Sequence, residues 1–590
     1  MAYIVAKAYH DIFNFIKKSN KLFIDTETDG LKPYHGNMPF SLQIGYLDTK
    51  DILYIPLRHT KNQMNMWCLC DEPFLELFKE ALENKELVAH NAKFDLHMLN
   101  SFFREYLGID FEPKKVICTL HFTKILFLDI RGASLNELSF EFNLPLKADL
   151  GLGKKEKYDE VAFEKMVSYG CRDIYVLQHL YNYLLNEVKC MNNDRRNGFL
   201  QYLPYELSST LELYYMEKTG VLLSQEKLEE AKKILETLYG LEKQAFFNMA
   251  GMDFVGSGKS IQKAFSQFDI VLPTKEKTNN PMADEEILEQ VNHPLAKIIL
   301  NIRGYEKLLK TYVYGFEKAQ DKNGIIHCSF NPVGAITGRM SCASMNLQNI
   351  PRTDNPINLR SIVTAPENFD IVSIDFAQQE LRIIFDLANE EELIKNILKG
   401  EDIHQTNANL AGIQRQDAKN MIFGILYGEG VGGLASQTGK SFKEAGILLN
   451  KIKNGLPKTT QYMKLMTEFS SENKFVMTPF MVKIPIVPQF AYKSTNAIIQ
   501  GTAANITKKW LVKCSSFFRT HDTYKELVFP CLVIHDEICF YVSQKITKNE
   551  DEMKKFMLII KQFALESSWG TNKVPMDCDA KILGRYWKKG

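Results

Sequence analysis

The chain has 590 residues and a formal net charge of +1, with 45% hydrophobic and 24% charged residues. This length predicts two to four domains with hydrophobic cores, and the composition excludes a disordered or fibrous protein. The eleven cysteines show no CxxC spacing, which argues against a zinc site or a disulfide framework and predicts buried free thiols. Because no apolar run could span a bilayer and no targeting segment is visible, we expect a soluble protein that does not bind membranes.

Strand-like and helical patterns alternate from residue 20 to about residue 190. The runs KLFIDTET and SLQIGYL predict strands, and ELVAHNAKFDLHMLNSFF predicts a strand followed by a helix. This alternation is typical of an α/β domain in which helices pack on a sheet. The polar stretch MNNDRRNG at 191–198 predicts the link to the next domain.

The rest of the chain is predicted to be mostly helical, with two separate strand signals. Periodic apolar positions predict helices through 205–320. The runs ENFDIVSIDF near residue 370 and VFPCLVIHDEICFYV near residue 535 predict strands. A long helical block separates these strands, so we expect one sheet whose functional residues come from both sides of that block.

Two glycine-rich motifs match nucleotide-binding loops only in part. FVGSGKS at 254–260 fails the phosphate-loop pattern because Asp253 stands where the first glycine is required. Gly428, Gly430 and Gly433 satisfy GxGxxG, but they follow a predicted helix instead of a strand. We therefore predict a turn before a helix at the first motif and a flexible helix end at the second.

A first set of acidic residues begins at a predicted strand. Asp25 and Glu27 are two positions apart, so their side chains point to the same side of an extended chain. Carboxylates that end apolar runs are costly to bury unless a cation compensates them, and two divalent metal ions are a common solution. Taken alone, the pair is better explained by hydrogen bonds to a turn than by catalysis.

Two later motifs change this interpretation, namely NAKFD at 91–95 and YGCRD at 169–173. With them the sequence resembles the DEDDy 3′–5′ exonucleases that are fused to bacterial-type DNA polymerases. On a helix, residues four apart face the same site, as the tyrosine and aspartate of the second motif would. The resemblance implies that Tyr169 orients the attacking water and that four carboxylates bind two metal ions: Asp25, Glu27, Asp95 and Asp173.

A second acidic set lies in the last third of the chain. Asp375 ends the apolar run DIVSI, and Asp536 with Glu537 interrupts CLVI…ICFYV in the manner of a tight hairpin. Either segment alone would fit acidic residues that cap strands. Between them, however, four side chains recur every four residues along one helix face: Arg415, Lys419, Phe423 and Tyr427. The two cations could neutralise a triphosphate, and the two aromatic rings could form an apolar wall for sugar and base.

Three long motifs carry the family resemblance, namely DFAQQELR at 375–382, RQDAKNMIFGILYG at 415–428 and IHDE at 534–537. They resemble motifs A, B and C of family A DNA polymerases of the Klenow-fragment type, and MEKTG at 216–220 and TGRMSCASMNLQNIP at 337–351 stand in the expected order. The resemblance implies a multidomain α/β and α+β fold, with a ribonuclease H-like exonuclease domain at 1–195 and a right-hand polymerase domain at 196–590. Its thumb is expected at about 205–320, its palm at about 321–400 and 506–590, and its fingers at about 401–505.

The same resemblance implies roles for individual residues. Asp375 and Asp536 would bind two Mg²⁺ ions, as would the carboxylates of the exonuclease site, and Mn²⁺ would substitute for Mg²⁺ at both sites. Glu537 would support the primer end. Lys419 would protonate the leaving pyrophosphate, and Glu380 would exclude a 2′-hydroxyl. The substrate-binding set is Arg415, Lys419, Phe423, Tyr427, Glu380, His404 and Gln378. The DNA-binding set is Arg339, Gln348, Asn349, Asn496, Gln500 and His535.

The sequence departs from the family at several positions. Motif A usually has the sequence DYSQIELR, so Phe376, Ala377 and Gln379 are predicted to place less hydroxyl and more amide beside the metal ions. Tyr492 and the lysine after it stand where relatives tend to have a template-contacting arginine. Phe423, where some relatives have tyrosine, implies discrimination against dideoxynucleotides.

Three other functions fit part of the pattern. A single-subunit RNA polymerase would share the two aspartates and the Arg/Lys helix, but Glu380 and the exonuclease motifs argue against it. An exonuclease with a degenerate, DNA-binding polymerase half is opposed by the retention of Asp375, Asp536, Arg415 and Lys419. A structural DNA-binding protein would explain local basic patches but not seven carboxylates at these spacings.

We expect primer-template DNA and dNTPs as partners of a monomeric protein, with a helicase, a primase and a single-strand binding protein as further replisome partners. Phosphate contacts should dominate DNA affinity and make it fall steeply with salt. The divergent, Lys- and Asn-rich sequence resembles that of an organellar replicase. This resemblance implies a location in an apicoplast, another plastid or a mitochondrion.

Overall fold

The structure is a computed structural model that describes residues 2–47, 49–58, 71–151, 157–275, 278–351, 356–401, 405, 408, 414–570 and 572–588. Its contacts form two compact units. The larger comprises Met1–Thr219, Phe330–Cys342 and Val372–Lys581, and the smaller comprises Gly220–Ser329, Ala343–Ile371 and Ile582–Gly590. Within the described part of the chain, no helix is both long and apolar enough to cross a bilayer.

The first part of the larger unit is an α/β domain, as the alternating pattern predicted. The described strands of its sheet have the order β1-β4-β3-β2-β5-β6, with β2, β3 and β4 antiparallel and the outer pairs parallel. The apolar residues Leu22, Ile24, Leu42 and Ile44 are fully buried in its core. The strands are β1 (Ala2–Val5), β2 (Lys21–Thr28), β3 (Pro39–Gly45), β4 (Asp51–Pro56), β5 (Glu86–Ala89) and β6 (Lys115–Cys118).

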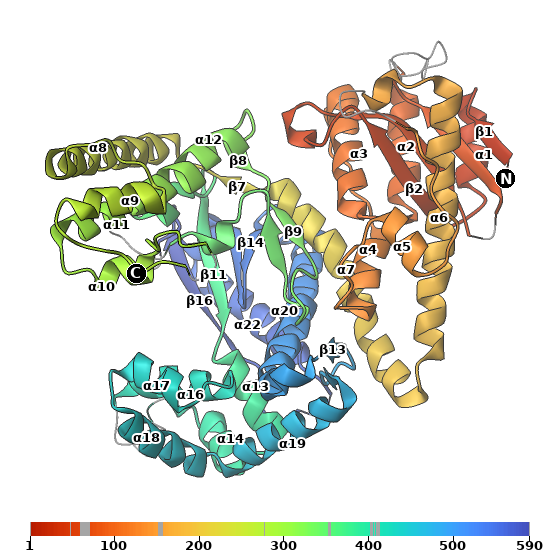
Figure 1. Ribbon diagram of the computed structural model, residues 1–590. Coiled ribbons are helices and arrows are strands. Elements are labelled where there is room, and N and C mark those ends of the chain that lie inside the picture. Colours follow the sequence, from red (N-terminus) through yellow and green to blue (C-terminus); the bar gives the residue numbers. More distant parts are fainter. Residues whose placement is uncertain are drawn as a thin grey trace. The chain divides into compact units, whose positions relative to one another are not determined.

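Helices cover this sheet, and two of them bring functional side chains to β2. Helices α3 and α6 both pack against β2 (Figure 1). Asp71 caps α2 by accepting a hydrogen bond from the Phe74 amide, and Ser134 and Glu137 form a capping box at α5. The helices are α1 (Tyr9–Ile16), α2 (Glu72–Glu83), α3 (Ala92–Leu107), α4 (Thr119–Leu126), α5 (Leu135–Glu141) and α6 (Phe163–Cys190).

The predicted link at 191–198 lies mostly in a helix, and the boundary between the compact units falls later, after Thr219. Helix α7 (Asn193–Thr219) begins only three residues after α6 ends, and Pro204 lies inside it. A proline removes one backbone hydrogen bond and costs about 3 kcal/mol in a helix interior. Packing of α7 against β6, β14 and α20 offsets this cost.

The smaller unit is mostly helical, as predicted for 205–320. Its core contains Phe246, Ile261, Phe265, Leu295 and Ile299. Ser257 caps α9, so FVGSGKS forms a turn before a helix, as predicted. The elements from this part of the chain are β7 (Val221–Leu222), α8 (Gln225–Ala250), α9 (Gly258–Ser266), α10 (Glu285–Gln290), α11 (Pro294–Lys307), α12 (Tyr314–Ala319) and β8 (Ile325–Ile326), followed by β9 (Ser329–Asn331) and β10 (Ser341–Ala343).

A second sheet joins the two predicted strand regions, which confirms that one sheet is assembled across the helical block. Its described strands have the order β14-β15-β11-β16 (Figure 1). Residues 535–536 form the tight turn between β14 and β15, and His535 adopts a left-handed φ of 56° there. The elements are β11 (Phe369–Phe376), α20 (Ser494–Thr520), β14 (Val528–Ile534), β15 (Glu537–Ser543), α21 (Gln544–Thr547), α22 (Glu550–Glu566) and β16 (Cys578–Gly584).

The helical block between the strands has its own apolar core, which includes Leu381, Ile422, Leu449 and Ile499. The GxGxxG sequence connects α16 to α17, so it follows a helix as predicted. The elements are α13 (Gln379–Ala388), α14 (Glu391–Leu398), α16 (Arg415–Leu426), α17 (Val431–Thr438), α18 (Phe442–Gly455), α19 (Pro457–Asn473), β12 (Phe475–Met477) and β13 (Lys483–Pro485). All described cysteines are free thiols, and all but Cys190 are buried.

Candidate active sites

The first site forms where α6 crosses β2. Asp25 and Glu27 project from β2, and Asp173 projects from α6. Each of the three offers a carboxylate oxygen, and these oxygens lie within 4.8 Å of one another. Glu27 and Asp173 are buried, with 8% and 4% of their surface exposed. Such a group can bind a divalent cation, because hard cations prefer carboxylate oxygens.

Asp95 stands at the edge of this group. It lies in the first turn of α3, and its Oδ1 atom accepts hydrogen bonds from the Thr26 amide (3.0 Å) and the Thr26 hydroxyl (2.8 Å). Thr26 lies between the two acidic residues of β2. Asp95, the fourth predicted carboxylate, is therefore held at the site through Thr26. It is not one of the three residues whose carboxylate oxygens lie within 4.8 Å of one another.

Burial and mutual repulsion make these carboxyls hard to ionise. Burial, followed by the charges of Asp173 and Asp95, raises the pKa of Asp25 well above its usual range. The same causes raise the pKa of Glu27 to about 8, and burial raises that of Asp95 to about 7 and that of Asp173 to about 6. A divalent cation would relieve both causes at once, so the donor set fits a metal ion.

Lys147 is a member of this site that sequence reasoning missed. Its Nζ atom lies 2.5 Å from Asp173 Oδ2 and 5.2 Å from the ring centre of Tyr169. The other oxygen of Asp173, Oδ1, is buried and has no hydrogen-bond partner among the described residues. One ammonium group thus compensates only part of the negative charge. Tyr169 and Asp173 are both in α6, one helical turn apart, as predicted.

The second site lies at the turn between β14 and β15. Asp375 is near the end of β11, and β11 is the neighbour of β15 in the sheet, so Asp375 and the turn residue Asp536 belong to adjacent strands. Burial raises the pKa of Asp536. Glu537 is buried, and its Oε1 atom accepts a hydrogen bond of 2.5 Å from the Ser373 hydroxyl.

Glu380 connects this turn to the helical block. It accepts hydrogen bonds from Arg339 Nη2 (2.5 Å) and from the Tyr427 hydroxyl (2.6 Å). A small cavity of about 60 Å³ lies beside these residues, and its lining also includes His535 and Asp536. Residues from motifs A, B and C therefore meet at one place, although Glu380 and Asp536 are 156 positions apart in the sequence (380 to 536).

Helix α16 carries the predicted cations on its exposed side. Arg415 and Lys419 are exposed, while Phe423 and the residue after the helix, Tyr427, are half-buried with ring centres 6.0 Å apart. This gradient from exposed cations to half-buried rings suits a ligand with a charged and an apolar end. His404 lies outside the described residues.

Comparisons with known proteins agree with this arrangement. A family model described as DNA polymerase family A matches residues 225–589, which is more than half of the chain. The chain belongs to this family. A model described as 3′–5′ exonuclease matches residues 6–189, the part of the polymerase that holds the first site.

Curated relatives named DNA polymerase I come from several bacteria. The chain is 25% identical to that of Pseudomonas aeruginosa over 90% of its length and 28% identical to that of Chloroflexus aurantiacus over 90%. It spans only 60% and 58% of these relatives. A solved structure titled "POL domain of Pol1 from M. smegmatis complex with DNA primer-template and dNTP" has a TM-score of 0.77 at 21% identity and 99% coverage of both chains, which shows a shared fold.

The predicted DNA-binding residues of the polymerase are distributed over both compact units. Asn496 and Gln500 are one turn apart on α20, on the face where Ala503 and Thr507 line the small cavity. His535 lies in the exposed hairpin turn, and Arg339 pairs with Glu380. Gln348 (buried) and Asn349 (exposed) belong to the smaller unit, and Gln378 precedes α13 with a left-handed φ of 54°.

Two of the motif A departures, Phe376 and Gln379, have structural partners on α20. The Phe376 ring is buried against Trp510 of α20, at 4.4 Å between ring centres. The Gln379 amide donates to the Ala503 carbonyl (3.4 Å) and the Thr507 hydroxyl (3.3 Å), also on α20. The extra amide therefore links α13 to α20, and Gln379 also lines the small cavity that Asp536 borders. No pattern in the sequence indicated these contacts.

Proposed function

We propose that this polymerase extends a primer 3′ end with dNTPs on a DNA template and removes mispaired nucleotides with its 3′–5′ exonuclease site. One observation carries the proposal: a single chain holds a buried carboxylate cluster on β2 and α6 and, separately, a hairpin aspartate that shares a cavity with Glu380 and Arg339. Membership of family A and the match to a 3′–5′ exonuclease model support it.

In the proposed exonuclease site, Asp25, Glu27, Asp95 and Asp173 hold two divalent ions, with Mg²⁺ as the physiological metal and Mn²⁺ as a substitute. Such ions supply a nucleophilic hydroxide and stabilise the leaving oxygen. Tyr169 orients the attacking water. Lys147 lies next to Asp173. Its positive charge reduces the repulsion between the scissile phosphate and the four carboxylates.

In the proposed polymerase site, Asp375 and Asp536 hold the metal ions, and Glu537 supports the hairpin through Ser373. Arg415 and Lys419 bind the triphosphate of the incoming dNTP, since both are exposed on one face of α16. Glu380, fixed by hydrogen bonds from Arg339 and Tyr427, blocks the space that a 2′-hydroxyl would need.

Variants that remove one site at a time test this proposal. Asp25→Ala with Glu27→Ala should abolish degradation of single-stranded DNA and leave primer extension unchanged, because the two carboxylates are confined to the first site. Asp536→Ala should abolish extension and leave degradation unchanged. Gel assays of one labelled primer measure both activities. Undiminished degradation by the double variant would contradict the exonuclease assignment, and undiminished extension by Asp536→Ala would contradict the polymerase assignment.

We further propose that the protein acts as a monomer on primer-template DNA beside a helicase, a primase and a single-strand binding protein. Its divergent, Lys- and Asn-rich sequence supports an organellar replicase, and we propose the apicoplast DNA polymerase of a malaria-type parasite. Immunolocalisation with a plastid marker tests the location, and a signal confined to the nucleus or cytosol would contradict it.

A further inference from the structure

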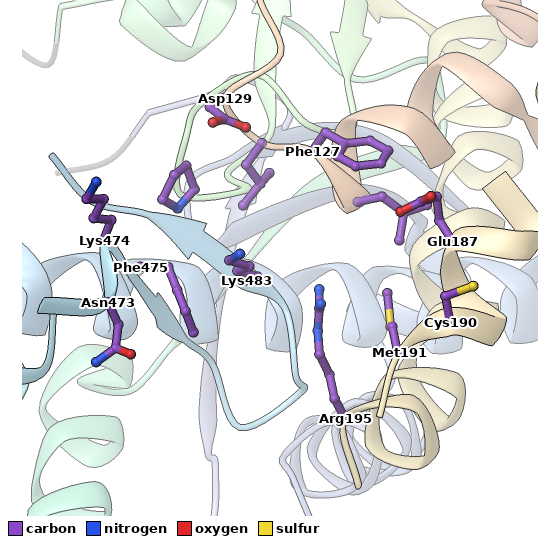
Figure 2. A pocket seen from close by; sticks show the side chains of 13 residues that line it. Phe127, Asp129, Glu187, Cys190, Met191, Arg195, Asn473, Lys474, Phe475 and Lys483 are labelled. Atoms are coloured by element: carbon purple, nitrogen blue, oxygen red, sulfur yellow. The ribbon is translucent and has the colours of Figure 1, made fainter. Parts of the chain in front are cut away.

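A pocket separate from both candidate sites lies between the exonuclease part and the β12–β13 hairpin of the larger unit (Figure 2). Its volume is about 410 Å³, which is in the usual size range of ligand pockets. Its lining comes from three segments that are far apart in sequence, residues 126–129, 187–195 and 473–485. None of the predicted site residues lines this pocket, and neither family match assigns a function to it.

Three cations line the pocket without acidic partners. Arg195, Lys474 and Lys483 have no carboxylate within ion-pair distance among the residues that the structure describes. Figure 2 shows the side chains of Arg195 and Lys483 reaching into the pocket from opposite elements, α7 and β13. Like charges that converge in this way repel each other, so the site favours an anion between them.

Arg195 is the most informative of the three. Its Nε atom is buried and has no hydrogen-bond partner in the described part of the chain. A buried donor without an acceptor is costly, and a guanidinium has no means of losing its charge. Arg195 also lies in the first turn of α7, where the helix dipole disfavours a cation and favours an anion. A bound phosphate would accept a hydrogen bond from Nε, neutralise the guanidinium charge and interact favourably with the helix dipole.

Two aromatic rings border the same space. Lys483 Nζ lies over one face of the half-buried Phe475 ring, 4.4 Å from the ring centre, and Phe469 packs against this ring edge-on at 5.7 Å between centres, so a base would stack on the other face. Phe127, also half-buried, lines the other side and packs against Phe142 at 5.3 Å. Rings that are held by neighbours and still line a cavity can stack with nucleobases.

The pocket also contains two carboxylates, which restrict how a polyanion could lie. Asp129 is exposed to solvent, so water and salt screen its charge, and Glu187 interacts with Tyr183. In Figure 2 Glu187 lies on the side of Phe127, away from Lys474 and Phe475, and Asp129 lies at the upper edge of the view. A nucleic-acid backbone would therefore pass between Arg195 and Lys483, away from both carboxylates.

We propose that this pocket binds single-stranded DNA, with a backbone phosphate between Arg195 and Lys483 and a base stacked on Phe475. The proposal rests on the proposed function, which brings DNA to both parts of the chain. Cations together with aromatic rings fit a single strand better than a free phosphate, which needs no ring, or a duplex, whose bases are already stacked. The strand is either the template overhang or the primer end on its way to the exonuclease site.

Binding of a fluorescent oligo(dT), measured by anisotropy over a range of salt concentrations, tests the proposal. All proteins carry Asp25→Ala and Glu27→Ala so that the probe is not degraded. Arg195→Ala with Lys483→Ala should weaken binding at least about tenfold and flatten the log–log salt dependence by about 0.7, the value for one lost phosphate contact. Phe475→Ala should weaken binding about fivefold or more without changing the salt dependence, and an abasic oligonucleotide should not distinguish it from the parent.

The chain offers matched controls. Arg196 follows Arg195, but its guanidinium donates to the Lys189 carbonyl and the Asn193 side chain, and it does not line the pocket. Lys464 is exposed on α19 outside the pocket. Arg196→Ala with Lys464→Ala removes the same charge and should change affinity less than about twofold. Equal losses in the two double variants, or no loss in either, would overturn the proposal.

Two substrates distinguish the sources of the strand. If the template overhang occupies the pocket, the Arg195/Lys483 variant will lose the gain in affinity that a longer overhang gives. If the primer end occupies it, the same changes in an exonuclease-active protein will slow degradation of mismatched primers selectively. Extension of a primer on a short overhang should remain. If the parent protein itself extends no primer, the proposed function fails whatever the oligo(dT) result.

Discussion

At the scale of single residues, the exonuclease carboxyls have an unusual relation between charge and pH. A carboxyl whose pKa rises on folding binds its proton more tightly in the folded state. For Glu27 this stabilises the folded protein below the usual pKa of 4.5, and the advantage is lost as the pH rises through about 8. The metal-free protein should therefore become less stable across the neutral range, and a bound cation should reverse this effect.

Metal binding should consequently release protons near pH 7. Asp95 and Glu27, with pKa values of about 7 and about 8, are then partly protonated and must ionise to bind a cation. We expect Mg²⁺ affinity to increase between about pH 6 and pH 8. Calorimetry in two buffers with different ionisation enthalpies measures the protons released. The Asp25→Ala, Glu27→Ala variant isolates the contribution of this site, and a buffer-independent heat in the parent would contradict the expectation.

Phe423 gives a second test at this scale. Its half-buried ring lies on the α16 face below Lys419. Phe423→Tyr should greatly increase dideoxynucleotide incorporation relative to dNTPs, because a hydroxyl on this ring can replace the missing 3′-hydroxyl of the substrate. Competition between ddNTPs and dNTPs on one primer measures the ratio. The same selectivity in variant and parent would refute the assigned position of Phe423 at the sugar.

At the scale of elements, α7 joins the exonuclease part to helix α20 through buried charges. Glu206 accepts hydrogen bonds from His121 of α4 and from Lys508 of α20, and all three are buried. Burial opposes ionisation of Glu206, but the charge of Lys508 and the bond from His121 lower its pKa to about 2. Further along, Glu212 pairs with Arg519, and Glu217 pairs with Lys93 of α3.

Glu217 also contacts Phe330, which lies in the part of the chain that matches the polymerase family. Its Oε1 atom accepts a hydrogen bond of 2.6 Å from the Phe330 amide, and Lys93 donates to the Phe330 carbonyl at 2.5 Å. Lys93 is two residues before Asp95 in α3. One lysine thus contacts both α7 and the chain segment that leads to Arg339, so the exonuclease helix and this segment are held together.

Removing one member of the α7 network should be costly. Glu206→Ala leaves Lys508 buried without its carboxylate partner, and breaking a buried pair in this way costs about 3–5 kcal/mol. We expect a clear decrease in the thermal midpoint of unfolding, measured by calorimetry. Gln201→Ala, at an exposed position in the interior of the same helix, should change stability by less than about 0.5 kcal/mol. Equal midpoints for the two variants would show that the network does not stabilise the protein.

At the scale of the whole molecule, the sequence predicted the strands that carry the acidic residues (β2, β11, β14 and β15) but not β16 or most of the short strands, and few of the contacts between distant segments. The β11 and β14–β15 strands were evident because long apolar runs end at acidic residues. The first part of helix α7, residues 193–204, was missed because its residues are mostly polar and Pro204 lies inside the helix, and its stability comes from tertiary packing. Lys147, Lys93 and Arg195 were missed because single lysines and arginines are usually solvated, and only the fold reveals what they contact.

Both proposed activities act on one primer end, and this is the central claim. The most direct measurement follows a labelled primer with a mismatched 3′ end on a template, with and without dNTPs. We predict shortening without dNTPs, and removal of the mismatch followed by full extension with dNTPs. The Asp25→Ala, Glu27→Ala variant should leave the mismatch in place while still extending a matched primer. Extension past the mismatch by the parent without its removal, or no synthesis on a matched primer, would contradict the account.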